Sequence, residues 1–159
     1  MKPLGQLVRA LRVVSVLSLA AMMLITIVDV TMRNTINELV LGGVELVQLT
    51  LVLSVFLALP ETFLRGEHIT IDLIDQFAPP RVVTSLRRAG ALLTLLLLTA
   101  IGWRMVLPAY DTIAIGDRTS DLQIPLVWYW LPLLAGIAAA VLAQAVVVIR
   151  ELRSPAGKG

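Results

Sequence analysis

Apolar residues in this chain gather into four blocks, at about residues 13–32, 44–64, 82–107 and 125–149. A helix rises 1.5 Å per residue, so about 20 residues cross the roughly 30 Å of a hydrocarbon core. Hydrophobic residues make up 58% of the chain and charged residues only 15%, whereas soluble domains have about 45–50% and about 25%. The sequence therefore predicts an all-α membrane protein with four transmembrane helices, forming one domain over residues 1–159.

The first block follows a basic start, as the apolar core of a secretory signal peptide does. Lys2, Arg9 and Arg12 precede it. No small-residue cleavage pattern follows, and the block passes directly into Asp29. Because three more apolar blocks lie downstream, we interpret the first block as a retained membrane span.

The connection between the second and third blocks reads RGEHITIDLIDQFAPPR. Ile69, Leu73 and Phe77 recur every four residues, and Asp72 and Asp75 fall on the other side. This pattern is typical of a short amphipathic helix lying at the membrane interface. The two aspartates have no second cluster of ligands nearby, so we interpret them as a solvated face and not as a paired-carboxylate site.

The basic residues are distributed unevenly between the two sides of a four-span topology. Ten of the 13 lie on the side of both termini, namely Lys2, Arg9, Arg12, Arg65, Arg81, Arg87, Arg88, Arg150, Arg153 and Lys158. The other three are Arg33, Arg104 and Arg118. Because Lys and Arg accumulate in cytoplasmic segments, we predict that both termini lie in the cytoplasm.

The composition excludes several classes of site. The chain has no cysteine, which rules out disulfides, thiolate metal sites and a cysteine nucleophile. The chain has a single histidine, His68, whereas a histidine-based metal or haem site usually needs several nitrogen or sulfur ligands, so we expect no such site. The net charge of +2 and the pI near 9.5 follow from basic residues flanking the spans, so nucleic acid is not an expected partner.

Nothing in the sequence indicates an enzyme or a bound cofactor. A catalyst needs converging polar groups, and a transporter acting alone needs charges or broken helices near the membrane midplane. Here the charges are predicted near span ends, and the middles of the spans are nearly featureless. This pattern favours spans that pack against a partner protein and do not themselves conduct a solute.

Charged residues lie at the end of the first span and at the start of the second. Asp29 and Arg33 are four residues apart, so on a helix they share a face and can pair. Glu45 lies in the first turn of the second span, where a carboxylate suits the helix dipole. Arg33 and Glu45 flank the short connection, and we predict that they pair across it.

The last two spans carry three further signals. Arg104 lies one turn before Pro108, so we predict that it ends the third span and extends to the outer interface. Trp128, Tyr129 and Trp130 open the fourth span as an aromatic belt would. Small residues recur at four-residue spacings that allow close helix packing: Ala135, Gly136, Ala139, Ala140 and Ala143.

Four pieces of sequence carry a family resemblance. They are VDVTMR at the end of the first block, GVELVQL at the start of the second, the turn RGEHITIDLID, and SDLQIPLVWYWLPLLAGI at the entry to the last. In this order, and with four spans, the chain resembles the small membrane subunit of tripartite ATP-independent periplasmic (TRAP) transporters, the DctQ-like family.

The resemblance implies a protein of the bacterial inner membrane that serves as scaffold and anchor. Such subunits pair with a large multi-span subunit that holds the substrate and sodium sites, and a periplasmic binding protein delivers the substrate, often an organic acid. By this resemblance, Arg65, His68 and Asp72 would order the inner turn against the large subunit or membrane lipids. Candidates for docking the binding protein are Asp117, Arg118 and Asp121.

Two other functions fit a small four-span protein. A proton-coupled exporter of the small multidrug-resistance type also has four spans and a key membrane glutamate, but that glutamate lies deep in the first span. Here the first span is uncharged until Asp29. The chain could also anchor an unrelated membrane complex.

Overall fold

The computed structural model describes residues 2–65 and 79–153. Four helices account for most of them: α1 (Lys2–Ile36), α2 (Gly43–Arg65), α4 (Pro80–Ile115) and α5 (Val127–Arg153). All four are long and apolar enough to cross a membrane. The prediction of an all-helical protein with four transmembrane helices is therefore confirmed, and the amphipathic helix predicted between the second and third spans lies outside the described residues.

Two helices are longer than the spans predicted from the sequence. α1 begins at Lys2, so its basic start is helical as well. α4 passes through Pro108 and ends at Ile115, although we predicted the span to end at residue 107. A proline inside a membrane helix is tolerated where neighbouring groups satisfy the freed backbone, and α4 ends where Gly116 adopts a left-handed conformation, with φ of 76°.

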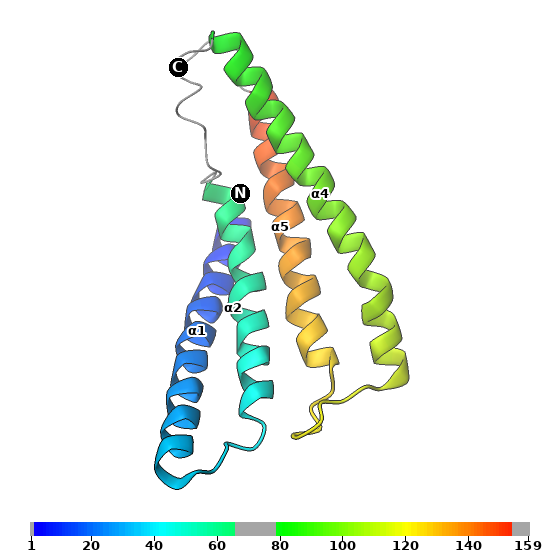
Figure 1. Cartoon of the computed structure of the whole chain (residues 1–159). Helices are drawn as coiled ribbons and strands as arrows, with labels where there is room; N and C mark the ends of the chain where they lie inside the picture. Colours follow the sequence, from blue (N-terminus) through cyan, green and yellow to red (C-terminus); the bar gives the residue numbers. More distant parts are fainter. Residues whose placement is uncertain (1, 66–78, 154–159) are drawn as a thin grey trace.

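The helices lie side by side in the order α1, α2, α5, α4 (Figure 1). α2 packs between α1 and α5, and α5 packs between α2 and α4. The α1–α2 and α4–α5 connections lie at the same end of the molecule, which we call the loop end (Figure 1). The opposite end, where α1 begins and α5 ends, is called the terminal end.

The α2–α5 contact, which we call the central seam, joins the two hairpins. The absence of a side chain at Gly136 allows this close contact. A Cβ at this position would lie only 2.3 Å from the carbonyl oxygen of Phe56 in α2. Ala140 and Ala143 next to it on α5 are fully buried. As the small-residue spacing predicted, backbones approach closely where side chains are small.

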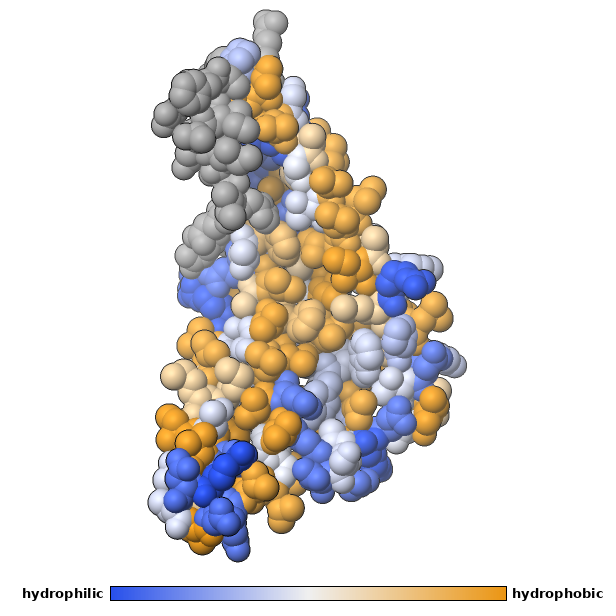
Figure 2. Space-filling view, viewed as in Figure 1, coloured by the Kyte–Doolittle hydropathy of each residue, from blue (hydrophilic) through white to orange (hydrophobic). Residues whose placement is uncertain are grey.

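Large apolar side chains cover much of the remaining surface. Figure 2 shows hydrophobic residues over most of the middle of one face and more hydrophilic residues towards the loop end. α4 is the extreme case, because no residue in its most apolar stretch is buried. Such a surface needs lipid or a partner protein to cover it.

Candidate functional site

Glu45 fastens the two hairpins together at the loop end. It lies in the first turn of α2 and is only 7% exposed. Its Oε1 accepts the backbone N–H of Asp121 at 2.7 Å, and its Oε2 accepts that of Leu122 at 2.9 Å. Hydrogen bonds to an ionised acceptor are stronger than neutral ones. One carboxylate thus holds the α4–α5 connection against the start of α2.

Two further contacts complete this arrangement, which we call the outer clamp. Gly42 has φ of 72°, and a Cβ there would lie 2.2 Å from the Cγ of Leu122. Only glycine combines this backbone conformation with room for the leucine side chain. The hydroxyl of Tyr129 donates to the carbonyl oxygen of Glu45 at 2.9 Å, so a residue predicted as part of an aromatic belt also joins α5 to α2.

The α4–α5 connection is itself an ordered hairpin. Thr119 and Ile124 are joined by a backbone hydrogen bond of 3.0 Å, and the N–H of Ile124 also donates to Thr119 Oγ1 at 2.9 Å. A second backbone bond runs from Leu126 N–H to the carbonyl of Asp117 at 3.0 Å. The tip of this hairpin is the part that the outer clamp holds.

The three predicted docking residues lie on this hairpin. Asp117, Arg118 and Asp121 are all exposed. Arg118 makes one long hydrogen bond, of 3.5 Å, to the carbonyl of Gln123. The outer clamp uses only the backbone of Asp121, so its carboxylate remains available at the surface.

The α1–α2 connection is ordered by Asp29. Its Oδ2 pairs with Arg33 at 3.0 Å, as the four-residue spacing predicted. Its Oδ1 accepts the backbone N–H of Val40 at 3.2 Å. The predicted pair between Arg33 and Glu45 is wrong, since Asp29 binds the first and the α4–α5 hairpin binds the second. Sequence spacing could show the local pair but not which distant N–H groups reach Glu45.

Of the three residues predicted at the inner turn, the structure describes only Arg65. Arg65 is the last residue of α2. His68 and Asp72 lie outside the described residues, so their predicted roles stay predictions.

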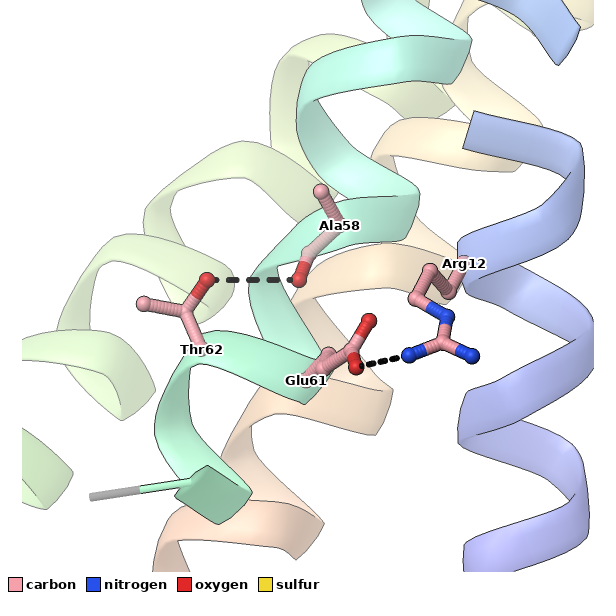
Figure 3. Close-up of polar contacts among 4 residues, drawn as sticks. All are labelled: Arg12, Ala58, Glu61 and Thr62. Carbon is pink, nitrogen blue, oxygen red and sulfur yellow. Dashed lines mark hydrogen bonds and ion pairs between the residues drawn. The ribbon is translucent and has the colours of Figure 1, made fainter. Parts of the chain in front are cut away.

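An ion pair at the terminal end was missed in the sequence. Arg12 of α1 donates to Glu61 of α2 at 2.8 Å, one turn before α2 ends, and Figure 3 shows the two side chains pointing toward each other. The side chain of Glu61 is 18% exposed and that of Arg12 is 42% exposed. A signal was present, because Glu61 is an acid within a predicted span and Arg12 precedes the neighbouring span in a hairpin.

Gln144 is the most buried polar side chain described. It lies in α5 with no exposed surface. Its Nε2 donates to the carbonyl of Ala91 in α4 at 3.0 Å, and its Oε1 has no hydrogen-bond partner among the residues that the structure describes. Interhelical bonds of this kind contribute about 0.6–2 kcal/mol in membranes. Gln144 therefore helps to join α4 to α5.

Arg104 lies far deeper than the sequence predicted. A Cβ at Gly102 would lie 2.9 Å from Ile137, and the adjacent residue of α5, Gly136, packs on Phe56 near the middle of α2. Arg104 is only about 3 Å farther along α4, so it is close to the centre of the apolar layer.

The predicted position of Arg104 at the end of its span is therefore wrong. α4 continues for about 16 Å beyond it, to Ile115. The error came from treating Pro108 as a helix end. A guanidinium at the bilayer centre costs about 2.5–3.5 kcal/mol on insertion scales and more in simulations.

The polar side chains described in this structure act mainly as links between helices and loops. No group of three or more His, Asp or Glu side chains among residues 2–65 and 79–153 could hold a metal ion. The polar groups instead join one helix or loop to another, at both ends and at Gln144. The arrangement suits a structural role better than chemistry.

Comparison with known proteins gives the family. The family model described as "Tripartite ATP-independent periplasmic transporters, DctQ component" matches residues 22–154, which include the outer clamp, the central seam and Arg104. No protein with a curated description matches the chain. Because the family match covers most of the sequence, the chain belongs to the DctQ family and is a small permease component of a TRAP transporter.

Proposed function

We propose that this small permease subunit is the fixed scaffold and membrane anchor for a large multi-span subunit that carries the solute. The observation that carries the proposal is the way the two hairpins are joined. The central seam holds them at mid-depth through Gly136 and Phe56, and the outer clamp holds them at the loop end through Glu45. Two fastenings at different depths make a stiff plate whose edge helices, α1 and α4, have extensive exposed surface.

The polar groups described in the plate favour a structural role over a solute route of its own. Its polar contacts hold helices and loops together, and the described acids lie toward the helix ends. We therefore assign transport to the partner, as a secondary, sodium-coupled uptake of organic acids. The family match offers no support for a small multidrug exporter.

The test is reconstitution with the partners. The chain, the large permease subunit and the periplasmic binding protein are expressed together, and uptake of labelled organic acids is measured with and without a sodium gradient. We expect a stable one-to-one membrane complex and uptake that requires all three proteins and sodium. Uptake by the large subunit and binding protein alone, at the full rate, would contradict the scaffold role.

We further propose that the α4–α5 hairpin docks the binding protein. The clamp fixes the hairpin's backbone while leaving the side chains of Asp117, Arg118 and Asp121 exposed. Charge reversal at Asp117 and Asp121 to Lys, together with Arg118→Glu, should reduce uptake severalfold while the two membrane subunits still copurify. Glu38→Lys, also at the loop end and exposed, is the matched control. Equal uptake by the triple variant and the control would count against docking.

This role requires the loop end to face the periplasm of an inner-membrane protein, with both termini in the cytoplasm. The distribution of basic residues supports that orientation. The chain has no cysteine, so single-cysteine variants can report it directly. A membrane-impermeant maleimide should label Ser120→Cys in whole cells and Arg150→Cys only after the inner membrane is opened. The reverse pattern would place the hairpin in the cytoplasm.

The inner turn is proposed to bind the large subunit or lipid headgroups through Arg65, His68 and Asp72. Alanine variants of His68 and Asp72 should lower the yield of the two-subunit complex, measured by copurification. Yields equal to that of the unchanged chain would assign these residues to a solvated turn.

A further inference from the structure

Arg104 is a cation in the middle of the apolar layer that nothing described in this chain neutralises. It is exposed on α4, level with the close contact of Gly102 on Ile137. The ion pairs among the described residues are Arg12 with Glu61 and Arg33 with Asp29, so Arg104 is in neither. An isolated guanidinium at this depth is unfavourable, which makes it a residue in need of a partner.

The helix geometry works against relief by lipid headgroups at the loop end. In a helix each Cα–Cβ bond tilts toward the N-terminus, which for α4 lies at the terminal end. The side chain of Arg104 thus starts out directed away from the nearer loop end, and about 16 Å of helix separates it from Ile115. Pro108, four residues on, also lacks the N–H that would bond the carbonyl of Arg104, which adds a backbone acceptor at the same level.

The side chains around Arg104 form a continuous exposed surface. Residues three and seven positions away share its side of the helix. Those residues are exposed and mostly apolar, and together with the arginine they make up what we call the Arg104 face: Leu97, Ile101, Arg104, Leu107 and Asp111. Asp111 lies at the loop-end margin of this face, whereas Arg104 lies among apolar side chains, and a charge in that setting is expected at a contact between helices, where it can be paired.

We propose that the Arg104 face is where α4 packs against the large permease subunit, and that Arg104 pairs there with an Asp or Glu inside one of that subunit's spanning helices. This inference rests on the proposed function. Charge complementarity identifies the occupant, because a carboxylate and a guanidinium buried together satisfy one another whereas each alone is unfavourable.

Among residues 2–65 and 79–153, no acid is placed to supply that carboxylate from a second copy of this chain. In a symmetric pair within one membrane, Arg104 would meet residues of its own depth. The nearest acid on α4 is Asp111, about 10 Å farther toward the loop end. Glu45 is occupied by the outer clamp and Glu61 by Arg12. The partner must therefore be a different polypeptide.

The first test is copurification of the large subunit with tagged chain after coexpression. Arg104→Gln and Arg104→Glu should recover about tenfold less large subunit, or less still, whereas Arg104→Lys retains a cation and should recover more than either. Arg9→Gln is the control, since Arg9 is also exposed but lies near the start of α1. Each variant expressed alone should give the same yield of monodisperse protein, because the face packs on nothing described in the chain itself. Equal recovery with Arg104→Gln would mean that the arginine reaches lipid phosphate, and would overturn the proposal.

The second test locates the contact. Leu107→Cys on the Arg104 face and Leu17→Cys on α1 are both well exposed, and a photoreactive maleimide on each reports its neighbour in the assembled complex. We expect the large subunit to be linked to residue 107. Links from residue 107 only to lipid or to a second copy would overturn the proposal. Replacing the acid found opposite with Arg should restore copurification of Arg104→Glu. If the unchanged chain fails to recover any large subunit, the proposed function itself is wrong, and that outcome is distinct from a failure of Arg104 alone.

Discussion

The central seam and the Arg104 face both belong to strongly apolar helices, but the seam is buried within the chain and the Arg104 face is exposed. In the seam, Gly136 and Ala140 of α5 lie close against α2 and are buried. On α4, leucines such as Leu96 and Leu97 are more than half exposed. Inside a bilayer, apolar character does not decide which residues are buried, because lipid tails are as apolar as leucine. What distinguishes a contact within the chain from an outward surface is the size of the residues and whether their polar groups have partners within the chain.

The same comparison holds for the charges. Glu45 is buried, and both of its carboxylate oxygens are satisfied within the chain. Arg104 is exposed at mid-depth and has no such partner in the described chain. The first is expected to matter for the stability of the isolated subunit and the second for its assembly. The predictions below test the contacts internal to the subunit, and the Arg104 variants described above test the outward one.

The largest effect is expected at Gly136. Gly136→Val places a branched side chain where even a Cβ would lie 2.3 Å from the Phe56 carbonyl oxygen. Because the obstacle is backbone, α2 and α5 must separate, and we expect a loss of about 3 kcal/mol or more, at the upper end of overpacking. The measurement is the temperature at which monodisperse protein is lost in detergent.

Two other glycines calibrate that result. A Cβ at Gly102 would meet the end of the Ile137 side chain at 2.9 Å, and one at Gly90 would meet nothing within 4 Å. Alanine at Gly102 should therefore cost less than at Gly136, and alanine at Gly90 should leave stability unchanged or raised, since alanine favours helix. If all three alanine variants behaved alike, close packing would not be what fastens the hairpins.

The next effect concerns the outer clamp. Glu45→Ala removes the acceptor of two backbone N–H groups, and bonds to a charged acceptor are each worth about 1.5–3 kcal/mol. Water at the loop end can hydrate the two freed N–H groups and so offset part of the lost hydrogen-bond energy. We therefore expect about 2–3 kcal/mol of destabilisation, seen as a lower thermal midpoint and lower membrane yield. Glu38→Ala, also an acid at the loop end but exposed, should change neither. A Glu45→Ala variant with unchanged yield and midpoint would show that Leu122 and Tyr129 suffice to hold the hairpin.

The sequence was sufficient for the helices and the local pairs, and insufficient for what long-range packing decides. Block length and hydrophobicity predicted four spans, and four-residue spacing predicted the Asp29–Arg33 pair. The partner of Glu45 could not be predicted, because backbone N–H groups 76 and 77 residues away carry no side-chain signature. The depth of Arg104 was misjudged because Pro108 was taken as a helix end, and only the packing of Gly102 on Ile137 shows the true level.

The smallest effect is expected for the ion pair at the terminal end. Arg12 and Glu61 bind at 2.8 Å, but both retain exposed surface, and pairs in that position contribute about 0.2–1 kcal/mol. A double-mutant cycle with Arg12→Gln and Glu61→Gln compares the thermal stabilities of the unchanged chain, the two single variants and the double variant. We expect a coupling energy below about 1 kcal/mol, and we expect added salt to reduce it further.

Glu61 has a further interaction besides the one with Arg12, so its single variant should cost more than that of Arg12. A coupling energy well above this range would place the pair in a drier environment than its exposure indicates. The pair would then join α1 to α2 through buried charge, as Glu45 joins the α4–α5 hairpin to α2 at the loop end.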